Sequence, residues 1–302
     1  MRAVVFDRFG GPEVLHLGEV PEPTAGAGQI RVRVGAVGLN PFDGKVRSGA
    51  MESAFPTRLP AVPGQEVAGV VDQVGDGVVG VAVGNRVAGW TSRGAAEHAV
   101  LKLWSPVPDG LDLPQAAALP VATEAARRAL RLLGPRPGET LLVHGASGGI
   151  GGLATQLAVA AGVTVIGTAA PANQERVAGY GAIPMVYGMV SGAGLVTRVR
   201  ALVPAVDAVL DAAGAGVLPD SIELRGSTER VLTLADPAAH QLGVQFPELP
   251  EPSASDLAET VDLVARGEVV LPVAAVLPLA DAARAQALVD DGRAGGKVVL
   301  VP

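Results

Sequence analysis

The chain contains no cysteine among its 302 residues, which excludes disulfide bonds and metal sites built from thiolates. Aromatic residues make up only 3%, so a surface on which nucleobases stack in series is not expected. Lysines and arginines are scattered and the formal net charge is −7, which disfavours a nucleic-acid partner. No apolar run reaches the roughly 18 residues that a membrane helix requires, and the start, MRAVVFDRFG, has no signal-peptide pattern. We therefore expect a soluble, cytoplasmic protein without a membrane or nucleic-acid partner.

Glycine is abundant instead, and one glycine-rich stretch, 138–162, organises the chain. The apolar run 141–143 leads directly into GASGGIGG at 145–152. Beyond the glycines, apolar residues recur at helical i, i+3, i+4, i+7 spacing. The pattern predicts a strand, a tight turn and a helix.

Such a turn lets backbone N–H groups and the positive end of a helix dipole approach a pyrophosphate. In the fingerprint G-x-G-x-x-G, Ala146 takes the first position, Gly148 the second and Gly151 the third. The pattern predicts a dinucleotide site. We expect its cofactor contacts at Ser147, Gly148, Gly149 and Ile150.

The first third of the chain is predicted to be rich in β-strands. Short runs rich in Val and Ala alternate with Gly and Pro clusters, as in a closed antiparallel barrel. The expected strands are 1–6, 29–35, 69–75, 85–90 and 97–102. A helical region over 114–133, divided at Pro120, follows them.

From residue 141 onward, strands alternate with helices, which predicts an α/β fold with a parallel, doubly wound sheet. The expected strands are 141–144, 163–168, 185–186, 208–211 and 230–235, with helices over 174–180 and 194–202. A helix from 255 to 267, a strand over 269–277, a helix near 281–290 and a strand over 297–301 complete the chain. We expect this tail to rejoin the first domain.

Eight segments then form one ordered pattern. They are VGLNPFDGKVRSG (37–49), PGQEVAGVVDQVG (63–75), VGNRVAG (83–89), GAAEHAV (94–100), LPVATEAARRAL (119–130), VHGASGGIG (143–151), VLDAAG (209–214) and GKVVLVP (296–302). In these segments the chain resembles the zinc-independent, zeta-crystallin-like quinone oxidoreductases of the medium-chain dehydrogenase/reductase superfamily. The resemblance implies a GroES-like β-barrel catalytic domain, 1–120 and 266–302, and a Rossmann domain, 121–265. It also implies a nicotinamide cofactor and a quinone or α,β-unsaturated carbonyl substrate.

The resemblance bears on zinc as well. In the zinc-dependent relatives, a ligand cysteine stands where this chain has Asn40, and a ligand histidine where it has Gln65. Neutral amides are poor ligands for zinc. The four histidines, at 16, 98, 144 and 240, form no i, i+4 pair. We expect no zinc.

Without a metal, the protein must itself donate hydrogen bonds to the carbonyl oxygen and supply a proton. We expect Asn40, which the resemblance also places beside the cofactor, and Lys45 to do this; Asp43 is a weaker candidate. The alternative is that Asn40 and Pro41 only form a turn and that Asp43 and Lys45 are a solvated pair. Glu66 lies in an apolar strand, where a structural role and a chemical one are equally open.

The second Rossmann strand is followed by AAPAN, 169–173, without the Asp or Glu that holds a ribose 2′-hydroxyl in NAD enzymes. This favours NADPH over NADH. The resemblance implies that a small hydroxyl residue, a lysine and a tyrosine hold the 2′-phosphate. Thr168 and Tyr187 match the first and last of these, while Asn173 stands at or near the lysine position with Arg176 close by. Leu234 is a further cofactor contact implied by the resemblance.

Three functions remain open: an NADPH-dependent quinone or enone reductase, an enoyl or ketone reductase dedicated to one pathway of secondary metabolism, and an NADPH-binding regulator with little turnover. The regulator remains an alternative because Ala125 replaces a threonine that members of the resembled family often have near the nicotinamide, with Thr123 two residues earlier, and because the phosphate-binding lysine is missing at Asn173. We also expect a homodimer through the apolar edge strand 269–277, by analogy with relatives that pair one strand across a two-fold axis.

Overall fold

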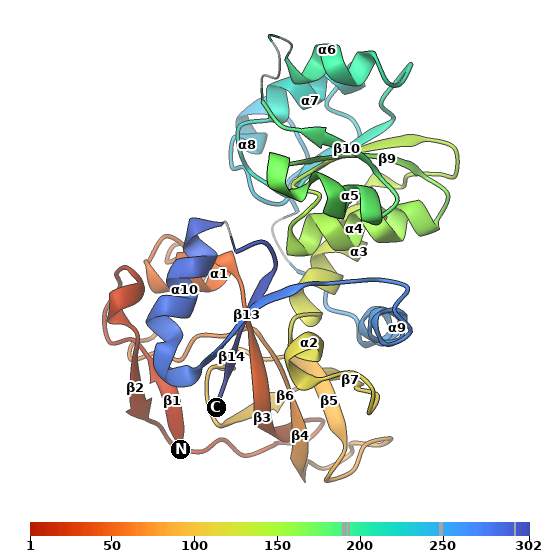
Figure 1. Ribbon diagram of the computed structural model, residues 1–302. Coiled ribbons are helices and arrows are strands. Elements are labelled where there is room, and N and C mark those ends of the chain that lie inside the picture. Colours follow the sequence, from red (N-terminus) through yellow and green to blue (C-terminus); the bar gives the residue numbers. More distant parts are fainter. Residues whose placement is uncertain (189–191, 193, 248–249, 293) are drawn as a thin grey trace. The chain divides into compact units, whose positions relative to one another are not determined.

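The computed structural model describes residues 1–188, 192, 194–247, 250–292 and 294–302 (Figure 1). The chain divides into two compact units. Unit 1 consists of residues 1–121 and 252–302, and unit 2 of residues 122–251.

Unit 1 is built on a seven-stranded sheet. In the described part of the chain its order is β13-β14-β3-β4-β5-β7, with β6 also paired to β3. All pairs are antiparallel except β13 with β14. The strands are β3 (Ile30–Leu39), β4 (Glu66–Val74), β5 (Arg86–Trp90), β6 (His98–Leu101), β7 (Leu103–Pro106), β13 (Val273–Pro278) and β14 (Lys297–Val301), and β1 (Arg2–Val5) pairs with β2 (His16–Glu19) as a ribbon.

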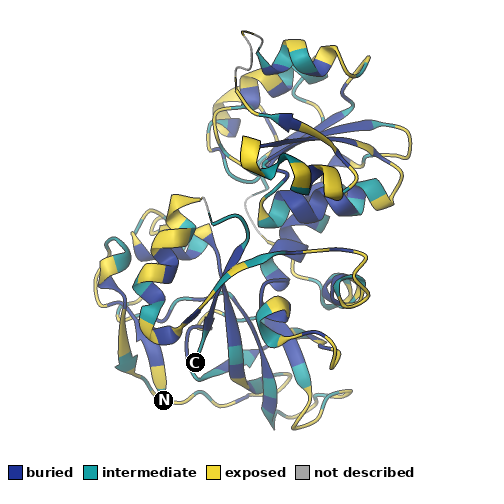
Figure 2. Ribbon diagram, viewed as in Figure 1, coloured by how far each residue is buried: buried dark blue, intermediate teal, exposed yellow. Residues whose placement is uncertain are grey.

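The last strand, β14, joins the sheet formed by the first third of the chain, because it pairs with β3. Phe6, Ile30 and Leu101 are buried in the core of unit 1. Figure 2 shows long stretches of β3 and β4 in the dark blue of buried residues. The helices of unit 1 are η1 (Pro12–Val14), α1 (Pro41–Arg47), α2 (Leu113–Ala117), α9 (Ala254–Ala265), η3 (Leu279–Asp281) and α10 (Ala282–Asp291).

Unit 2 contains a five-stranded parallel sheet of order β10-β9-β8-β11-β12, which confirms the predicted doubly wound fold. Its strands are β8 (Thr140–His144), β9 (Thr164–Ala169), β10 (Ile183–Val186), β11 (Ala208–Asp211) and β12 (Val231–Thr233). Every residue of β8 and β11 is buried, as expected of strands covered on both faces. The helices are α3 (Pro120–Leu133), α4 (Gly149–Ala160), η2 (Pro171–Asn173), α5 (Gln174–Gly179), α6 (Leu195–Arg200), α7 (Leu218–Arg225) and α8 (Ala239–Leu242).

Two of the differences between the structure and the sequence prediction concern the bounds of unit 1 and of its edge strand. Residues 252–265, expected in the Rossmann domain, group with unit 1, because α9 packs against β7. The strand expected over 269–277 begins only at Val273, since Pro272 has no N–H to donate to a ladder. In the described residues, no helix is both long and apolar enough to cross a membrane.

Candidate active site

Asn40 stands where β3 ends and α1 begins. It is the N-cap residue of α1, and Pro41 takes the first helical position, where a missing N–H costs nothing. The Asp43 carboxylate accepts the Asn40 backbone N–H at 2.8 Å. The segment is therefore more than the turn considered from sequence: it is a capped helix start with fixed geometry.

The Asn40 side chain belongs to a buried network with Glu66 at the start of β4 and Lys297 at the start of β14. Its Nδ2 donates to Glu66 Oε1 at 2.8 Å. The Lys297 ammonium donates to Asn40 Oδ1 and to Glu66 Oε1, both at 2.6 Å. Gly38 pairs with Glu66 and Leu39 with Val298, so β4, β3 and β14 bring the three residues together. Because an ammonium can only donate, Oδ1 faces Lys297, and one of the two Nδ2 hydrogens remains for another acceptor.

Glu66 has a second contact that ties this network to the start of a helix. Its Oε2 accepts the Val121 N–H at 2.7 Å, in the first turn of α3, whose free N–H groups favour a carboxylate. The sequence left the role of Glu66 open. The structure makes it an acceptor for Asn40 Nδ2, the Lys297 ammonium and the Val121 N–H, all within unit 1.

Asp43 is completely buried beside this network. Burial raises its pKa to about 7, and the nearby Glu66 charge acts in the same direction. The backbone N–H groups of Asn40 and Gly64 and the Lys297 charge partly oppose that rise in pKa.

Lys45 lies on the exposed side of α1 and makes no ion pair with a residue that the structure describes. The structure thus brings Asn40 together with Glu66 and Lys297, not with Lys45. No local signal in the sequence pointed to Lys297, which lies 257 positions from Asn40.

In unit 2, the glycine turn follows β8 as predicted. Gly145 has a left-handed backbone (φ 76°), and Gly148 is the N-cap of α4. A Cβ on Gly151 would stand 2.3 Å from the Gly145 carbonyl oxygen, whereas one on Gly148 would stand 3.3 Å from it. Close approach therefore requires glycine at 151 more than at 148.

The turn leaves backbone donors free for a ligand. The N–H groups of Gly149, Ile150 and Gly151 find no backbone acceptor in the described chain. Ser147, Gly149 and Ile150 are half-buried and Gly148 is exposed. This row of donors at a helix start fits a dinucleotide pyrophosphate.

Thr168 ends up inside the sheet rather than on its surface. It is buried, and its hydroxyl lies 3.2 Å from His144 Nδ1; Nε2 of the same imidazole lies 3.1 Å from Ser221 Oγ. Since Ser221 donates its own hydrogen to the Val217 carbonyl, Nε2 carries the imidazole proton and Thr168 donates to Nδ1. Burial lowers the pKa of His144 to about 4, which keeps this imidazole neutral. The Thr168 hydroxyl hydrogen is therefore donated to His144, and a contact between Thr168 and the cofactor stays a prediction.

The other predicted cofactor contacts lie at the carboxyl ends of the parallel strands. Tyr187 is 56% exposed, and its N–H donates to the Ala169 carbonyl at the end of β9. Leu234 is half-buried after β12, with its N–H on the Asp211 carbonyl at 2.9 Å. Asn173 closes η2, and Arg176 lies in α5; both are half-buried.

Thr123 is buried, its hydroxyl has no hydrogen-bond partner in the described chain, and Ala125 beside it is also buried. Among the described residues, no three His, Asp or Glu side chains gather as a metal site would require.

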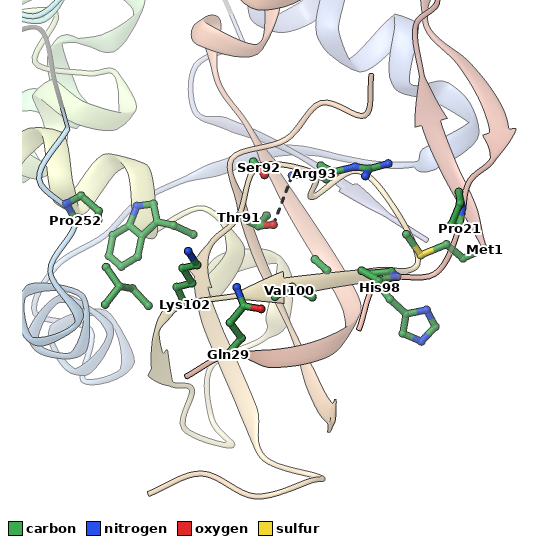
Figure 3. A pocket seen from close by; sticks show the side chains of 14 residues that line it. Met1, Pro21, Gln29, Thr91, Ser92, Arg93, His98, Val100, Lys102 and Pro252 are labelled. Atoms are coloured by element: carbon green, nitrogen blue, oxygen red, sulfur yellow. Dashed lines mark hydrogen bonds between the residues drawn. The ribbon is translucent and has the colours of Figure 1, made fainter. Parts of the chain in front are cut away.

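A separate cavity of about 540 Å³ opens on unit 1 (Figure 3). Trp90, Thr91, Arg93, His98 and Lys102 are among its lining residues, and none of the predicted site residues is. The cavity is therefore distinct from the Asn40 network.

Two family models match the chain: the alcohol dehydrogenase GroES-like domain at residues 26–104 and the zinc-binding dehydrogenase at residues 190–300. The rat quinone oxidoreductase is 43% identical over 175 residues, which cover 56% of this chain and 53% of the rat protein. The match thus spans about half the length of that relative.

Two comparisons extend over the full chain. The chloroplast envelope quinone oxidoreductase homolog of Arabidopsis thaliana is 31% identical over 324 aligned positions, covering 100% of this chain and 98% of that protein. The structure of Escherichia coli quinone oxidoreductase complexed with NADPH is 26% identical, with a TM-score of 0.85 and 100% of both chains covered. With these matches and the two-unit fold, the chain belongs to the quinone oxidoreductase family of the medium-chain dehydrogenase/reductase superfamily.

Proposed function

We propose that this protein is a zinc-independent, NADPH-dependent reductase that acts on quinones or α,β-unsaturated carbonyl compounds. The observation that carries the proposal is the glycine turn, where three N–H groups find no backbone acceptor in the described part of the chain and Gly151 permits the close backbone approach. The absence of an acid in 169–173 supports NADPH over NADH. The names of the rat and Escherichia coli relatives support the substrate class.

In this proposal, the turn at 147–150 holds the pyrophosphate, and Tyr187 and Asn173, with Arg176 nearby, face the 2′-phosphate. Leu234 borders the cofactor at the end of β12. When bound, the nicotinamide supplies the hydride.

The chain's own chemistry centres on Asn40. We assign its second Nδ2 hydrogen to the substrate oxygen on which negative charge develops, because Glu66 and Lys297 fix the amide in one orientation. Lys45, exposed on α1, is the proposed source of the proton that the α-carbon receives. Replacement of Lys45 by methionine should lower turnover and leave dinucleotide affinity unchanged.

Zinc has no place in this arrangement. Asn40 and Gln65 occupy the positions of the zinc ligands in the zinc-dependent relatives, and the Lys297 ammonium already lies against Asn40 Oδ1. A second cation there would meet both electrostatic repulsion and a poor donor set. Elemental analysis of purified protein should find no stoichiometric zinc, and activity should persist in chelator; one zinc per chain would overturn this part.

The proposal is tested by NADPH oxidation with matched panels of quinones, enones, enoyl thioesters and ketones. Turnover across quinones and simple enones is the expected result. Strong selectivity for one enoyl or ketone substrate would favour a reductase dedicated to one pathway of secondary metabolism. Tight NADPH binding without turnover on any panel member would favour a regulator.

We further propose a homodimer through β13, which lies at the edge of the unit 1 sheet and pairs on one side with β14. Val276 is 49% exposed there, and an uncovered apolar edge invites a second strand. Light scattering at micromolar concentration should give twice the 30.3 kDa chain mass, and Val273→Pro should shift it toward monomer. A monomeric parent would refute the dimer.

A further inference from the structure

Arg198, a residue that the sequence pattern did not single out, holds the end of β10 from helix α6. Its Nη1 donates to the Val186 carbonyl at 2.8 Å, and its Nη2 donates to the Gly188 carbonyl. The two carbonyls flank Tyr187, whose own N–H donates to Ala169 on β9. One guanidinium therefore fixes the backbone on both sides of Tyr187.

The Arg198 charge is not neutralised by a neighbouring acid in the described chain. It forms no ion pair there, and its Nε is buried without a hydrogen-bond partner. The residues that follow Gly188, MVSGA at 189–193, carry no ionisable side chain in the sequence. Arg200 on the same helix differs, because it is 58% exposed and pairs with Glu223 at 3.0 Å.

This charge stands next to the point where nucleotide preference is decided in Rossmann folds. An acid at the end of the second strand, β9, selects an unphosphorylated ribose, and a cation nearby accommodates a 2′-phosphate. Here 169–173 contains no acid and no cation, and Asn173 is neutral. The Tyr187 N–H donates to the Ala169 carbonyl at the end of β9, so the end of β10 lies beside the end of β9. Arg198, bound to the Val186 carbonyl, therefore holds its positive charge at the end of the strand next to β9.

We propose that Arg198 is a specificity-determining residue for a 2′-phosphorylated adenine dinucleotide. It acts by positioning Tyr187 and by contributing a positive charge that no described carboxylate cancels. The inference rests on the proposed function, since it assumes that the dinucleotide binds at this edge of the unit 2 sheet. It adds a source of selectivity that does not depend on Asn173 or Arg176.

The test compares Arg198→Met with Arg198→Lys and with the matched control Arg200→Met. Dissociation constants are measured by calorimetry for NADPH and NADH, and for the fragments 2′,5′-adenosine bisphosphate and 5′-AMP, at low and high salt. Thermal unfolding shows that each variant is folded.

Loss of the charge in Arg198→Met should weaken NADPH and 2′,5′-adenosine bisphosphate about five- to tenfold at low salt, as expected for one cation near a phosphate. The effect should shrink at high salt because ions screen it. NADH and 5′-AMP should change less than about twofold, since they lack that phosphate. Arg198→Lys keeps the charge but cannot donate to both backbone carbonyls in the same geometry, so its NADPH affinity should lie between those of the parent and Arg198→Met. Arg200→Met should leave all four constants unchanged.

An unchanged NADPH-to-NADH ratio in folded Arg198→Met would overturn the inference and leave the proposed function intact. Equal weakening of both dinucleotides would also overturn it, because a purely structural role predicts that result. Failure of the parent to bind any dinucleotide would remove the proposed function itself, and this inference with it.

Discussion

Replacement of Lys297 by methionine should destabilise unit 1 far more than the loss of an ordinary surface charge. The Lys297 side chain is 8% exposed and its partner Glu66 is 0% exposed, so water replaces neither contact. Methionine matches the length of the lysine stem but leaves the Glu66 carboxylate buried and unpaired. It also removes the donor to Asn40 Oδ1.

Breaking a buried ion pair by removing one partner costs about 3–5 kcal/mol. Glu66 would keep its hydrogen bonds from Asn40 Nδ2 and the Val121 N–H, so we expect a free-energy cost toward the lower end of this range. We expect the free energy of unfolding to fall by about 3 kcal/mol. The double variant Lys297→Met with Glu66→Gln should recover part of this loss, because the unpaired charge is then gone.

Urea unfolding followed by tryptophan fluorescence suits this test, since both tryptophans, Trp90 and Trp104, lie in unit 1. The matched control is Lys102→Met, an exposed lysine of the same unit that should change stability by no more than about 0.5 kcal/mol. If Lys297→Met matched this control, or if the double variant were no more stable than Lys297→Met, the assignment of a buried ion pair would be refuted.

Four other substitutions, in three tests, examine the site. Gly151→Ala should destabilise the chain by about 1–3 kcal/mol and abolish dinucleotide binding, because the added Cβ would stand 2.3 Å from the Gly145 carbonyl oxygen. Gly148→Ala should be tolerated, because its Cβ would stand 3.3 Å from the same oxygen. Equal effects of the two substitutions on stability and binding would contradict this. Burial raises the Asp43 pKa from 3.8 to about 7, so the folded state binds the proton more tightly than the unfolded state, and this residue's contribution to stability is lost as pH rises from about 4 to about 7. Asp43→Asn should therefore flatten the plot of unfolding free energy against pH in that range. An unchanged slope of this plot would contradict the raised pKa. Asn173→Lys should improve NADPH affinity about tenfold, since a charged hydrogen bond contributes about 1.5–3 kcal/mol, and no gain in calorimetry would mean that this side chain does not face the phosphate.

The sequence alone was sufficient to predict the structural features that depend on residues close together along the chain. Apolar runs of strand length that alternate with helical spacing predicted β8 to β11 and the helices between them, because both periods are local. The glycine turn was also predicted from the sequence. Position 145 has a left-handed backbone and position 151 has no room for a Cβ, and glycine is the residue that meets both requirements.

Tertiary structure decided which polar side chains share a site. Asn40 and Lys297 are 257 positions apart, and only the pairing of β3 with β14 places them at 2.6 Å. Thr168 has the right residue type for a phosphate contact, yet parallel register sets it beside His144, which takes its hydroxyl hydrogen. Residue spacing along the chain does not predict which polar side chains become partners, because burial and hydrogen-bond partners depend on strands that are distant in sequence and adjacent only in the folded sheet.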